Sequence, residues 1–184
     1  RFIFASTCSV YGKCDGAAVE ETSLNPQSLY AKSKIKSEEG ILSLIDGNFS
    51  PSILRMATLY GLSPRMRFDL VVNTMTMKAI TEGKITVFGG EQWRPFLHIE
   101  SAAESYLKCL ESPIEKVSGQ VFNVGSDSQN YQISRLGELV KKLIPNTKIE
   151  ILNEEGEGSQ LDNRDYNVSF KKINSIILCY SKKR

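Results

Sequence analysis

Short apolar runs and amphipathic stretches alternate along this chain. The apolar runs predict buried strands, at residues 2–5, 52–57, 85–88, 96–99, 120–124 and 148–152. Apolar residues at helical spacing predict helices, at residues 28–45, 69–82, 101–111, 134–143 and 170–178. This alternation is typical of a parallel α/β sheet. The strands at 85–88 and 148–152 depart from it and indicate a smaller mixed lobe.

Local signals refine the ends of these elements. Asn25 is followed by proline, so Asn25 is expected to cap the first helix. Ser134 has Glu138 just downstream, a spacing close to a capping box, and is expected to begin the helix at 134–143. The stretch from the first strand to Ser23 contains Gly12 and Gly16 and is expected to be a loop. The residues expected on one side of the second helix are Leu70, Asn73, Met77 and Ile80.

Composition narrows the possible classes of function. The chain has 184 residues, of which 41% are hydrophobic and 24% charged, as in an ordinary globular domain. With 23 Lys and Arg against 21 Asp and Glu the net charge is +2, and the order of charges shows no long basic block. We therefore expect no nucleic-acid partner. No apolar run approaches the roughly 18 residues that span a bilayer, so we expect no membrane partner.

The cysteines and the histidine indicate neither a metal site nor a disulfide framework. The residues concerned are Cys8, Cys14, Cys109, Cys179 and His98. No Cys-x-x-Cys pair occurs, so a Cys/His metal site is not expected. Scattered thiols in a chain of this size favour a reducing, cytoplasmic setting. His98 is expected to have a structural role at the end of a strand.

The chain begins inside a predicted element. Residues 1–5 read as a buried strand from the second residue onward, and no Met precedes Met56. Because native termini are usually polar and loosely held, we expect the sequence to be a piece of a longer protein.

The candidate chemistry lies in Thr7, Tyr30 and Lys34. Tyr30 and Lys34 are four residues apart in a predicted helix and therefore share one face. A tyrosine phenol ordinarily titrates near pH 10, but an ammonium group about 4 Å away stabilises the phenolate enough for acid/base work near neutral pH. Thr7 follows the first buried strand, where ligands bind in open α/β sheets. Its hydroxyl could hold a substrate oxygen while Tyr30 moves the proton.

Five motifs in chain order resemble the extended short-chain dehydrogenase/reductase family, in its NAD-dependent epimerase/dehydratase group that acts on nucleotide sugars. They are Ser6-Thr7-Cys8-Ser9-Val10-Tyr11-Gly12, Tyr30-Ala31-Lys32-Ser33-Lys34, Leu54-Arg55-Met56-Ala57-Thr58-Leu59-Tyr60-Gly61, Arg94-Pro95-Phe96-Leu97-His98-Ile99 and Phe122-Asn123-Val124-Gly125. The resemblance implies the C-terminal half of a Rossmann-like, doubly wound parallel sheet with a smaller mixed α/β substrate-binding lobe. Residues 1–62 and 97–125 would belong to the NAD-binding domain, and residues 63–96 and 126–184 to the substrate lobe.

The resemblance also implies roles for individual residues. Thr7, Tyr30 and Lys34 would be catalytic, with Lys34 favouring the phenolate and holding the nicotinamide ribose together with Tyr30. The residues beside the nicotinamide would be Met56, Ala57, Thr58 and Leu59. The substrate would be bound by Thr7, Thr58, Arg94 and Arg164, the two arginines gripping its diphosphate. The implied cofactor is NAD, with NADP as the alternative, and the partners are a nucleotide-sugar substrate and, at full length, a second copy in a homodimer.

Three departures from the family pattern bear on the reaction. Family 4,6-dehydratases carry Asp-Glu after the catalytic threonine, whereas this chain has Cys8 and Ser9, which disfavours dehydration. Thr58 stands where many relatives have an asparagine. The Gly-rich phosphate loop is expected before Arg1, so residues 1–184 alone are expected to bind NAD weakly. The segment 156–158 does not replace that loop, because Leu161 falls where its third glycine should be.

The sequence therefore favours an NAD-dependent nucleotide-sugar epimerase that works through transient oxidation to a keto intermediate and hydride return. Two alternatives stay open. One is an NAD(P)-dependent sugar reductase or dehydrogenase on the same scaffold, and the other is a sensor or assembly protein that binds the cofactor without catalysis.

Overall fold

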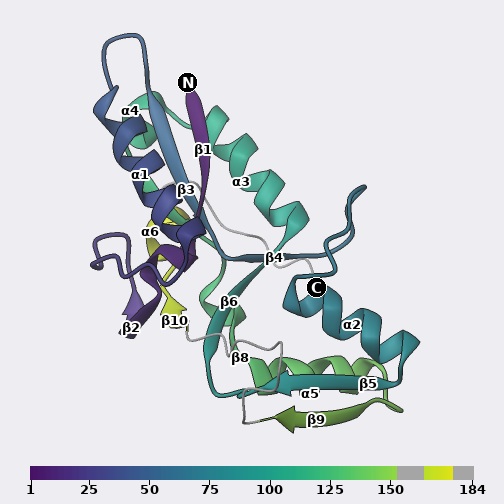
Figure 1. Ribbon diagram of the computed structural model, residues 1–184. Helices are drawn as coiled ribbons and strands as arrows, with labels where there is room; N and C mark the ends of the chain where they lie inside the picture. The colour runs from purple at the N-terminus through teal and green to yellow at the C-terminus, as the bar shows by residue number, and fades with distance from the viewer. Residues whose placement is uncertain (153–163, 176–184) are drawn as a thin grey trace.

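The computed structural model describes residues 1–152 and 164–175 (Figure 1). The strands are β1 (Phe2–Thr7), β2 (Lys13–Ala18), β3 (Pro51–Met56), β4 (Thr58–Tyr60), β5 (Lys84–Phe88), β6 (Trp93–His98), β7 (Val121–Val124), β8 (Asn130–Gln132), β9 (Lys148–Leu152) and β10 (Asp165–Val168). The α-helices are α1 (Leu29–Ser43), α2 (Val71–Thr81), α3 (Ile99–Glu111), α4 (Ile114–Val117), α5 (Ile133–Leu143) and α6 (Lys171–Ile173). Two 3-10 helices are η1 (Cys8–Tyr11) and η2 (Asp127–Gln129).

A parallel sheet with the order β1-β3-β7 forms the centre of the fold. All six residues of β3 are buried, because the strand has a neighbour on each edge and because α1 and α3 lie on either side of β1 and β3 in Figure 1. In the register of the sheet Thr7 pairs with Met56, and Met56 pairs with Val124. The carboxyl ends of the three strands therefore meet at one edge of the sheet.

The strands predicted at 85–88 and 148–152 pair with each other, away from the central sheet. They form the parallel pair β5-β9, with Ile85 opposite Ile149. The helices α2 and α5 pack against this pair and bury their own cluster of apolar residues. That cluster consists of Met75, Ala79, Ile85, Val87, Phe96, Ile133, Leu136 and Val140. The chain is thus α/β with parallel sheets, as the sequence predicts.

The remaining strands connect these two parts. The strand β6 runs parallel to β4 and antiparallel to β8. The strands β2 and β10 form a further parallel pair. Four residues from β10 and the segment after it, Tyr166, Val168, Phe170 and Ile173, pack in the same apolar cluster as the central sheet. The division into a cofactor domain and a substrate lobe stays a prediction.

The segment after β1 differs from the predicted loop. It contains η1 and the strand β2, which is paired with β10 about 150 residues later in the chain. The sequence Lys-Cys-Asp-Gly-Ala-Ala of β2 lacks the alternation of a half-buried strand, so only this distant pairing forms it. The strand β4 is likewise formed by its pairing with β6.

Both predicted helix caps are wrong. Ser28, not Asn25, caps α1, because the Ser28 hydroxyl accepts the Ala31 N–H. The Asn25 side-chain amide instead donates to the Lys13 carbonyl. At α5 the N-cap is Gln132 without a side-chain hydrogen bond, and the Ser134 hydroxyl donates to the carbonyl of Gly90.

One further prediction differs from the structure, and several fall outside the described residues. In α2 the buried residues are Met75 and Ala79, while Ile80 is 69% exposed, because the positions of β5 and α5 decide which face is covered. The last helix, α6, is described only over Lys171–Ile173. The end of its predicted range, the segment 156–158, Leu161 and Cys179 lie outside the described residues.

Candidate active site

A cleft of about 990 Å³ opens beside the carboxyl ends of β1 and β3, with α1, α2 and β5 among its walls. This volume is at the upper end of the range for small-molecule sites. The cleft is lined by every site residue that the sequence singles out: Thr7, Tyr30, Lys34, Met56, Ala57, Thr58, Leu59, Arg94 and Arg164. The ends of parallel strands are the usual place for a ligand in an open α/β sheet.

Thr7 is the last residue of β1, and its side chain has two contacts with Ser9. The Thr7 Oγ1 accepts the Ser9 backbone N–H at 3.1 Å and so caps η1. The Ser9 Oγ lies 2.9 Å from the same oxygen. Both residues line the cleft. The Thr7 hydroxyl is therefore held in place where β1 ends.

Tyr30 and Lys34 lie on one face of the first turns of α1. The Lys34 Nζ donates to the Ala5 carbonyl of β1 at 2.8 Å. The same nitrogen lies 5.7 Å from the centre of the Tyr30 ring and 4.6 Å from the centre of the Phe4 ring. Tyr30 is 56% exposed, and its ring lines the cleft. The ammonium group is thus fixed to β1 near the Tyr30 ring.

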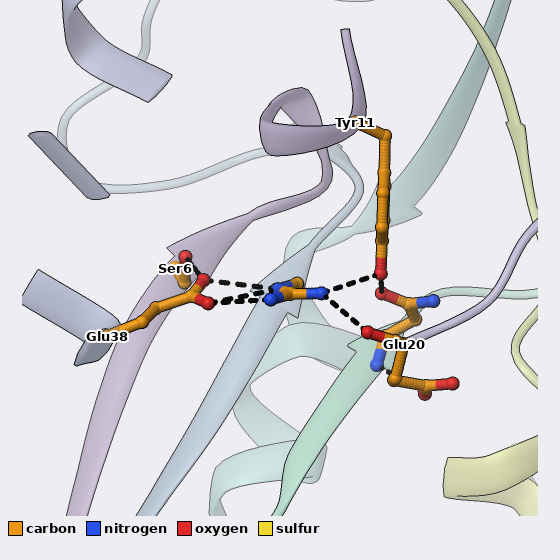
Figure 2. A network of polar contacts seen from close by, with 6 residues as sticks. Ser6, Tyr11, Glu20 and Glu38 are labelled. Atoms are coloured by element: carbon orange, nitrogen blue, oxygen red, sulfur yellow. Dashed lines mark hydrogen bonds and ion pairs between the residues drawn. The ribbon is translucent and has the colours of Figure 1, made fainter. Parts of the chain in front are cut away.

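Ser6, which lines the cleft, belongs to a buried network of charged and polar groups (Figure 2). At its centre the Arg55 Nη2 lies 2.7 Å from the Glu38 carboxylate, and the Arg55 Nε lies 3.2 Å from both carboxylate oxygens. The Arg55 Nη1 donates to the Tyr11 hydroxyl at 3.0 Å and to the Glu20 carbonyl at 3.1 Å. Burial acts to lower the pKa of Arg55, but its hydrogen bonds to Glu38 and Tyr11 and its charge interactions with both residues together outweigh this effect, and the net shift is upward.

The network extends from Arg55 to four elements of the fold. The Ser6 hydroxyl donates to the Glu38 carboxylate. The Tyr11 hydroxyl donates to the Asn123 side-chain carbonyl at 2.7 Å, and the Asn123 N–H donates to the Glu20 carboxylate at 2.8 Å. These contacts join β1 and α1, which carry the three candidate catalytic residues, to β3 and β7 (Figure 2).

The segment from the end of β3 into β4 forms another wall of the cleft. Met56 and Ala57 are buried, and Thr58 and Leu59 are half-buried. The Ala57 N–H donates to the Val124 carbonyl at 3.0 Å, which ties this segment to the end of β7. This wall is mostly apolar and lines the same cleft as Lys34.

Positive side chains converge on the cleft. Among the residues that the structure describes, its cations are Lys34, Arg67, Lys78, Arg94 and Arg164, and its lining contains one carboxylate, Asp69. Arg94 is only 4% exposed, with its guanidinium 5.2 Å from the centre of the Tyr166 ring. Arg67 makes two hydrogen bonds to Asp69, of 3.1 and 2.6 Å, which raise the pKa of Arg67 and lower that of Asp69. A cleft with this excess of cations suits a ligand that carries several negative charges.

Cys8 and Ser9, which stand where family dehydratases have Asp-Glu, face different surroundings. Cys8 is 1% exposed, does not line the cleft, and donates through its thiol to the Arg55 carbonyl at 3.1 Å. Burial raises the pKa of the Cys8 thiol well above its ordinary value. Cys8 is therefore a packing residue and not an acid or a base, whereas the Ser9 hydroxyl lines the cleft.

His98 has structural contacts, as predicted. Its Nδ1 accepts the Glu100 N–H at 3.3 Å and caps α3, and its ring packs edge-on against Tyr60 with centres 5.3 Å apart. Among residues 1–152 and 164–175, no cluster of three or more His, Cys, Asp or Glu could hold a metal ion. Over the same residues, none of the helices has the length and apolar character needed to traverse a bilayer.

The structure adds residues that the sequence does not single out. Ser9 stands in the first motif, so its place two residues after Thr7 could have indicated a contact. Arg67, Asp69 and Lys78 lie between and within elements whose packing the local pattern does not reveal, so the sequence carries no signal for their placement in the cleft.

The chain is similar in sequence to known proteins. The family model described as the NAD dependent epimerase/dehydratase family matches residues 1–125. YtcB of Bacillus subtilis strain 168, named as an uncharacterized UDP-glucose epimerase, is 34% identical over 127 residues, which are 67% of this chain and 39% of YtcB.

Solved structures show the same fold. The UDP-glucuronic acid 4-epimerase of Bacillus cereus, in complex with UDP-glucuronic acid and NAD, has a TM-score of 0.78 and 26% identity, over 98% of this chain and 57% of that protein. The dTDP-glucose 4,6-dehydratase of Bacillus anthracis strain Ames, in complex with NAD, also has a TM-score of 0.78, with 23% identity over 95% of this chain and 54% of that protein.

These matches bear out the resemblance in the five motifs and the Rossmann-like α/β architecture. The chain spans about half the length of the proteins that it matches, between 39% and 57% in these three. With the family model matching its first 125 residues, the chain belongs to the NAD-dependent epimerase/dehydratase family.

Proposed function

We propose that the protein is an NAD-dependent epimerase that acts on a sugar linked to a nucleoside diphosphate. The observation that carries the proposal is the meeting of Thr7, Tyr30 and Lys34 in one cleft with an excess of positive side chains. The first set of residues suits the removal and return of a hydroxyl proton. The excess of positive side chains suits the binding of a diphosphate.

The cleft residues fit the nicotinamide part of the cofactor. The apolar wall from Met56 to Leu59 would cover one face of the ring, and the Tyr30 hydroxyl and the Lys34 ammonium would hold the ribose hydroxyls. Lys34 has three N–H donors and gives one of them to Ala5, so it has donors to offer a ribose. When bound, NAD supplies a hydride acceptor for a carbon–hydrogen bond and a donor for its return.

The chain's own residues would manage the proton. The Tyr30 phenolate, stabilised by the Lys34 ammonium, takes the proton of the sugar hydroxyl as that carbon is oxidised. Thr7 holds the same oxygen with a hydrogen bond. The sugar then turns over as a keto intermediate, and Tyr30 returns the proton to the oxygen when the carbon is reduced from its other face.

The diphosphate would bind among the cations. Arg94 is buried and its guanidinium is a fork of fixed donors, which matches phosphate oxygens in a bidentate manner. Arg164 and Lys78 line the same cleft and would add to the positive potential. Thr58, at the start of β4, would touch the sugar where many relatives have an asparagine.

Epimerisation fits this site better than dehydration. Elimination of water needs an additional acid and base beside Thr7. The two residues at those positions are Cys8, whose buried thiol does not line the cleft, and Ser9, whose side chain is a hydroxyl. Neither side chain ionises to serve as a base near neutral pH.

We propose further that the full-length protein is a cytoplasmic homodimer. The reducing setting is supported by the free thiols of Cys8, Cys14 and Cys109. The family resemblance supports the dimer.

The removal of the Tyr30 hydroxyl tests the proposed function. The full-length protein and its Tyr30→Phe variant would be incubated with NAD and a panel of UDP- and dTDP-sugars, and epimer formation would be followed by chromatography. We expect kcat to fall by about 10²- to 10⁴-fold, because the variant has no group to take the hydroxyl proton.

The matched control is Tyr131→Phe, which removes a phenol that does not line the cleft. It is expected to keep the wild-type rate. Normal turnover by Tyr30→Phe would contradict the proposed role of Tyr30. The absence of turnover by the wild type, together with tight NAD binding, would favour a non-catalytic sensor instead.

A further inference from the structure

The hydroxyl of Thr7 has an unusual partner for a group that is to hold substrate. Its oxygen already accepts the backbone N–H of Ser9 at 3.1 Å, and the Ser9 hydroxyl oxygen lies 2.9 Å away. Ser9 is 3% exposed, yet it lines the cleft next to Thr7. The hydroxyl groups of Thr7 and Ser9 are therefore joined by one hydrogen bond, in which either of them could be the donor.

The direction of that hydrogen bond decides what Thr7 can offer to a ligand. A hydroxyl has one proton and two acceptor positions. If Ser9 donates to Thr7, both acceptor positions of Thr7 are filled by Ser9 and the Thr7 proton is free for the cleft. If Thr7 donates to Ser9, its proton is used and Thr7 can only accept from a ligand.

The proposed reaction requires Thr7 to be a donor. A sugar hydroxyl has one proton, which must go to Tyr30, so this oxygen can only accept from Thr7. After oxidation the oxygen is a carbonyl, which again can only accept. An accepting Thr7 would instead draw the hydroxyl proton away from Tyr30 and would lose its bond to the keto intermediate.

We propose that Ser9 is a positioning residue that donates its hydroxyl proton to Thr7 and thereby keeps Thr7 a donor toward the substrate oxygen. This inference rests on the proposed function. The Ser9 side chain is not needed to cap η1, because the backbone N–H makes that contact. Ser9→Ala therefore keeps the cap and removes only the second hydrogen bond.

A double-mutant cycle in the full-length protein tests the inference. The variants are Ser9→Ala, Thr7→Val and the double variant, with kcat and KM measured for the nucleotide sugar that the wild type turns over best. We expect Ser9→Ala to lower kcat by about 10-fold, the worth of one hydrogen bond of about 1.4 kcal/mol, with KM changed less than about 3-fold. In the Thr7→Val background the same change should have no further effect, because Ser9 acts through Thr7.

Two more variants complete the design. Ser9→Thr keeps a hydroxyl and is expected to keep kcat within about 3-fold of the wild type. If Ser9→Ala does not fold, Ser9→Cys takes its place in the cycle, because a thiol of similar size is only a weak donor. Thermal unfolding of each variant separates a loss of kcat from a loss of the folded state.

The outcomes distinguish this inference from the proposed function. A fully active Ser9→Ala beside an impaired Thr7→Val would overturn the role of Ser9 and leave the proposed function standing. Independent, multiplicative losses from the two changes would also overturn it, because Ser9 would then not act through Thr7. A fully active Thr7→Val would overturn the proposed role of Thr7 itself.

Discussion

At the scale of single residues, the buried pair of Arg55 and Glu38 connects stability to the candidate site. Two opposite charges out of water are tolerated here because each has further hydrogen bonds, from Ser6 to the carboxylate and from the guanidinium to Tyr11. The removal of one member of such a pair leaves the other charge buried and uncompensated.

We predict that Glu38→Gln lowers the free energy of unfolding by about 3–5 kcal/mol. The neighbouring Glu39 is exposed on the same helix, so Glu39→Gln is the matched control, with an expected effect within about 0.5 kcal/mol. Urea unfolding of both variants would measure the difference. If both changes lowered the free energy of unfolding equally, the buried ion pair would contribute no more to stability than an exposed carboxylate does.

The sequence singled out Thr7, Tyr30 and Lys34 as candidates because their motifs combine side-chain chemistry with local spacing, and all three line the cleft. It did not identify Arg67 or Lys78, because only the packing of the segments that carry them brings these cations into the cleft. The place of Thr7, Tyr30 and Lys34 in the cleft was thus predictable from local spacing, the place of Arg67 and Lys78 was not, and the roles of all five stay predictions.

At the scale of elements, the turn between η1 and β2 needs a glycine. Gly12 has a φ of +63°, and a Cβ at this position would lie 1.7 Å from the Asn25 carbonyl oxygen. The same carbonyl belongs to the segment that leads into α1, so the turn packs directly on the approach to the helix of Tyr30 and Lys34. A side chain on Gly12 would push this segment away from β1.

We predict that Gly12→Ala destabilises the protein more than Gly16→Ala does. Gly16 also has a positive φ, of +75°, but a Cβ there would meet nothing within 4 Å. Both changes introduce backbone strain of roughly 1–2 kcal/mol, and Gly12→Ala adds roughly 1–3 kcal/mol of overpacking. Thermal unfolding of the two variants checks the order, and a lower midpoint for Gly16→Ala would contradict it.

Most of the elements could be predicted because their own apolar pattern defines them. The strands β5 and β9 are examples, and so is the central strand β3. The strands β2 and β4 could not be predicted, because each is formed by pairing with a strand far along the chain. The buried face of α2 was also missed, since the positions of β5 and α5 select Met75 and Ala79.

At the scale of the whole molecule, the fold concentrates charge that the composition does not reveal. The net charge is only +2, yet the described lining of the cleft brings together Lys34, Arg67, Lys78, Arg94 and Arg164 with one carboxylate, that of Asp69. Such a concentration of cations suits a ligand that carries several negative charges, as the proposed nucleotide sugar does.

The central claim is that the substrate is oxidised and reduced again within one turnover, so the cofactor is returned unchanged. The most direct test follows NADH absorbance and product identity together while the full-length protein acts on a nucleotide sugar. The account predicts that the epimer accumulates over many turnovers with no net formation of NADH. Formation of NADH in step with an oxidised product would contradict it and would identify a dehydrogenase.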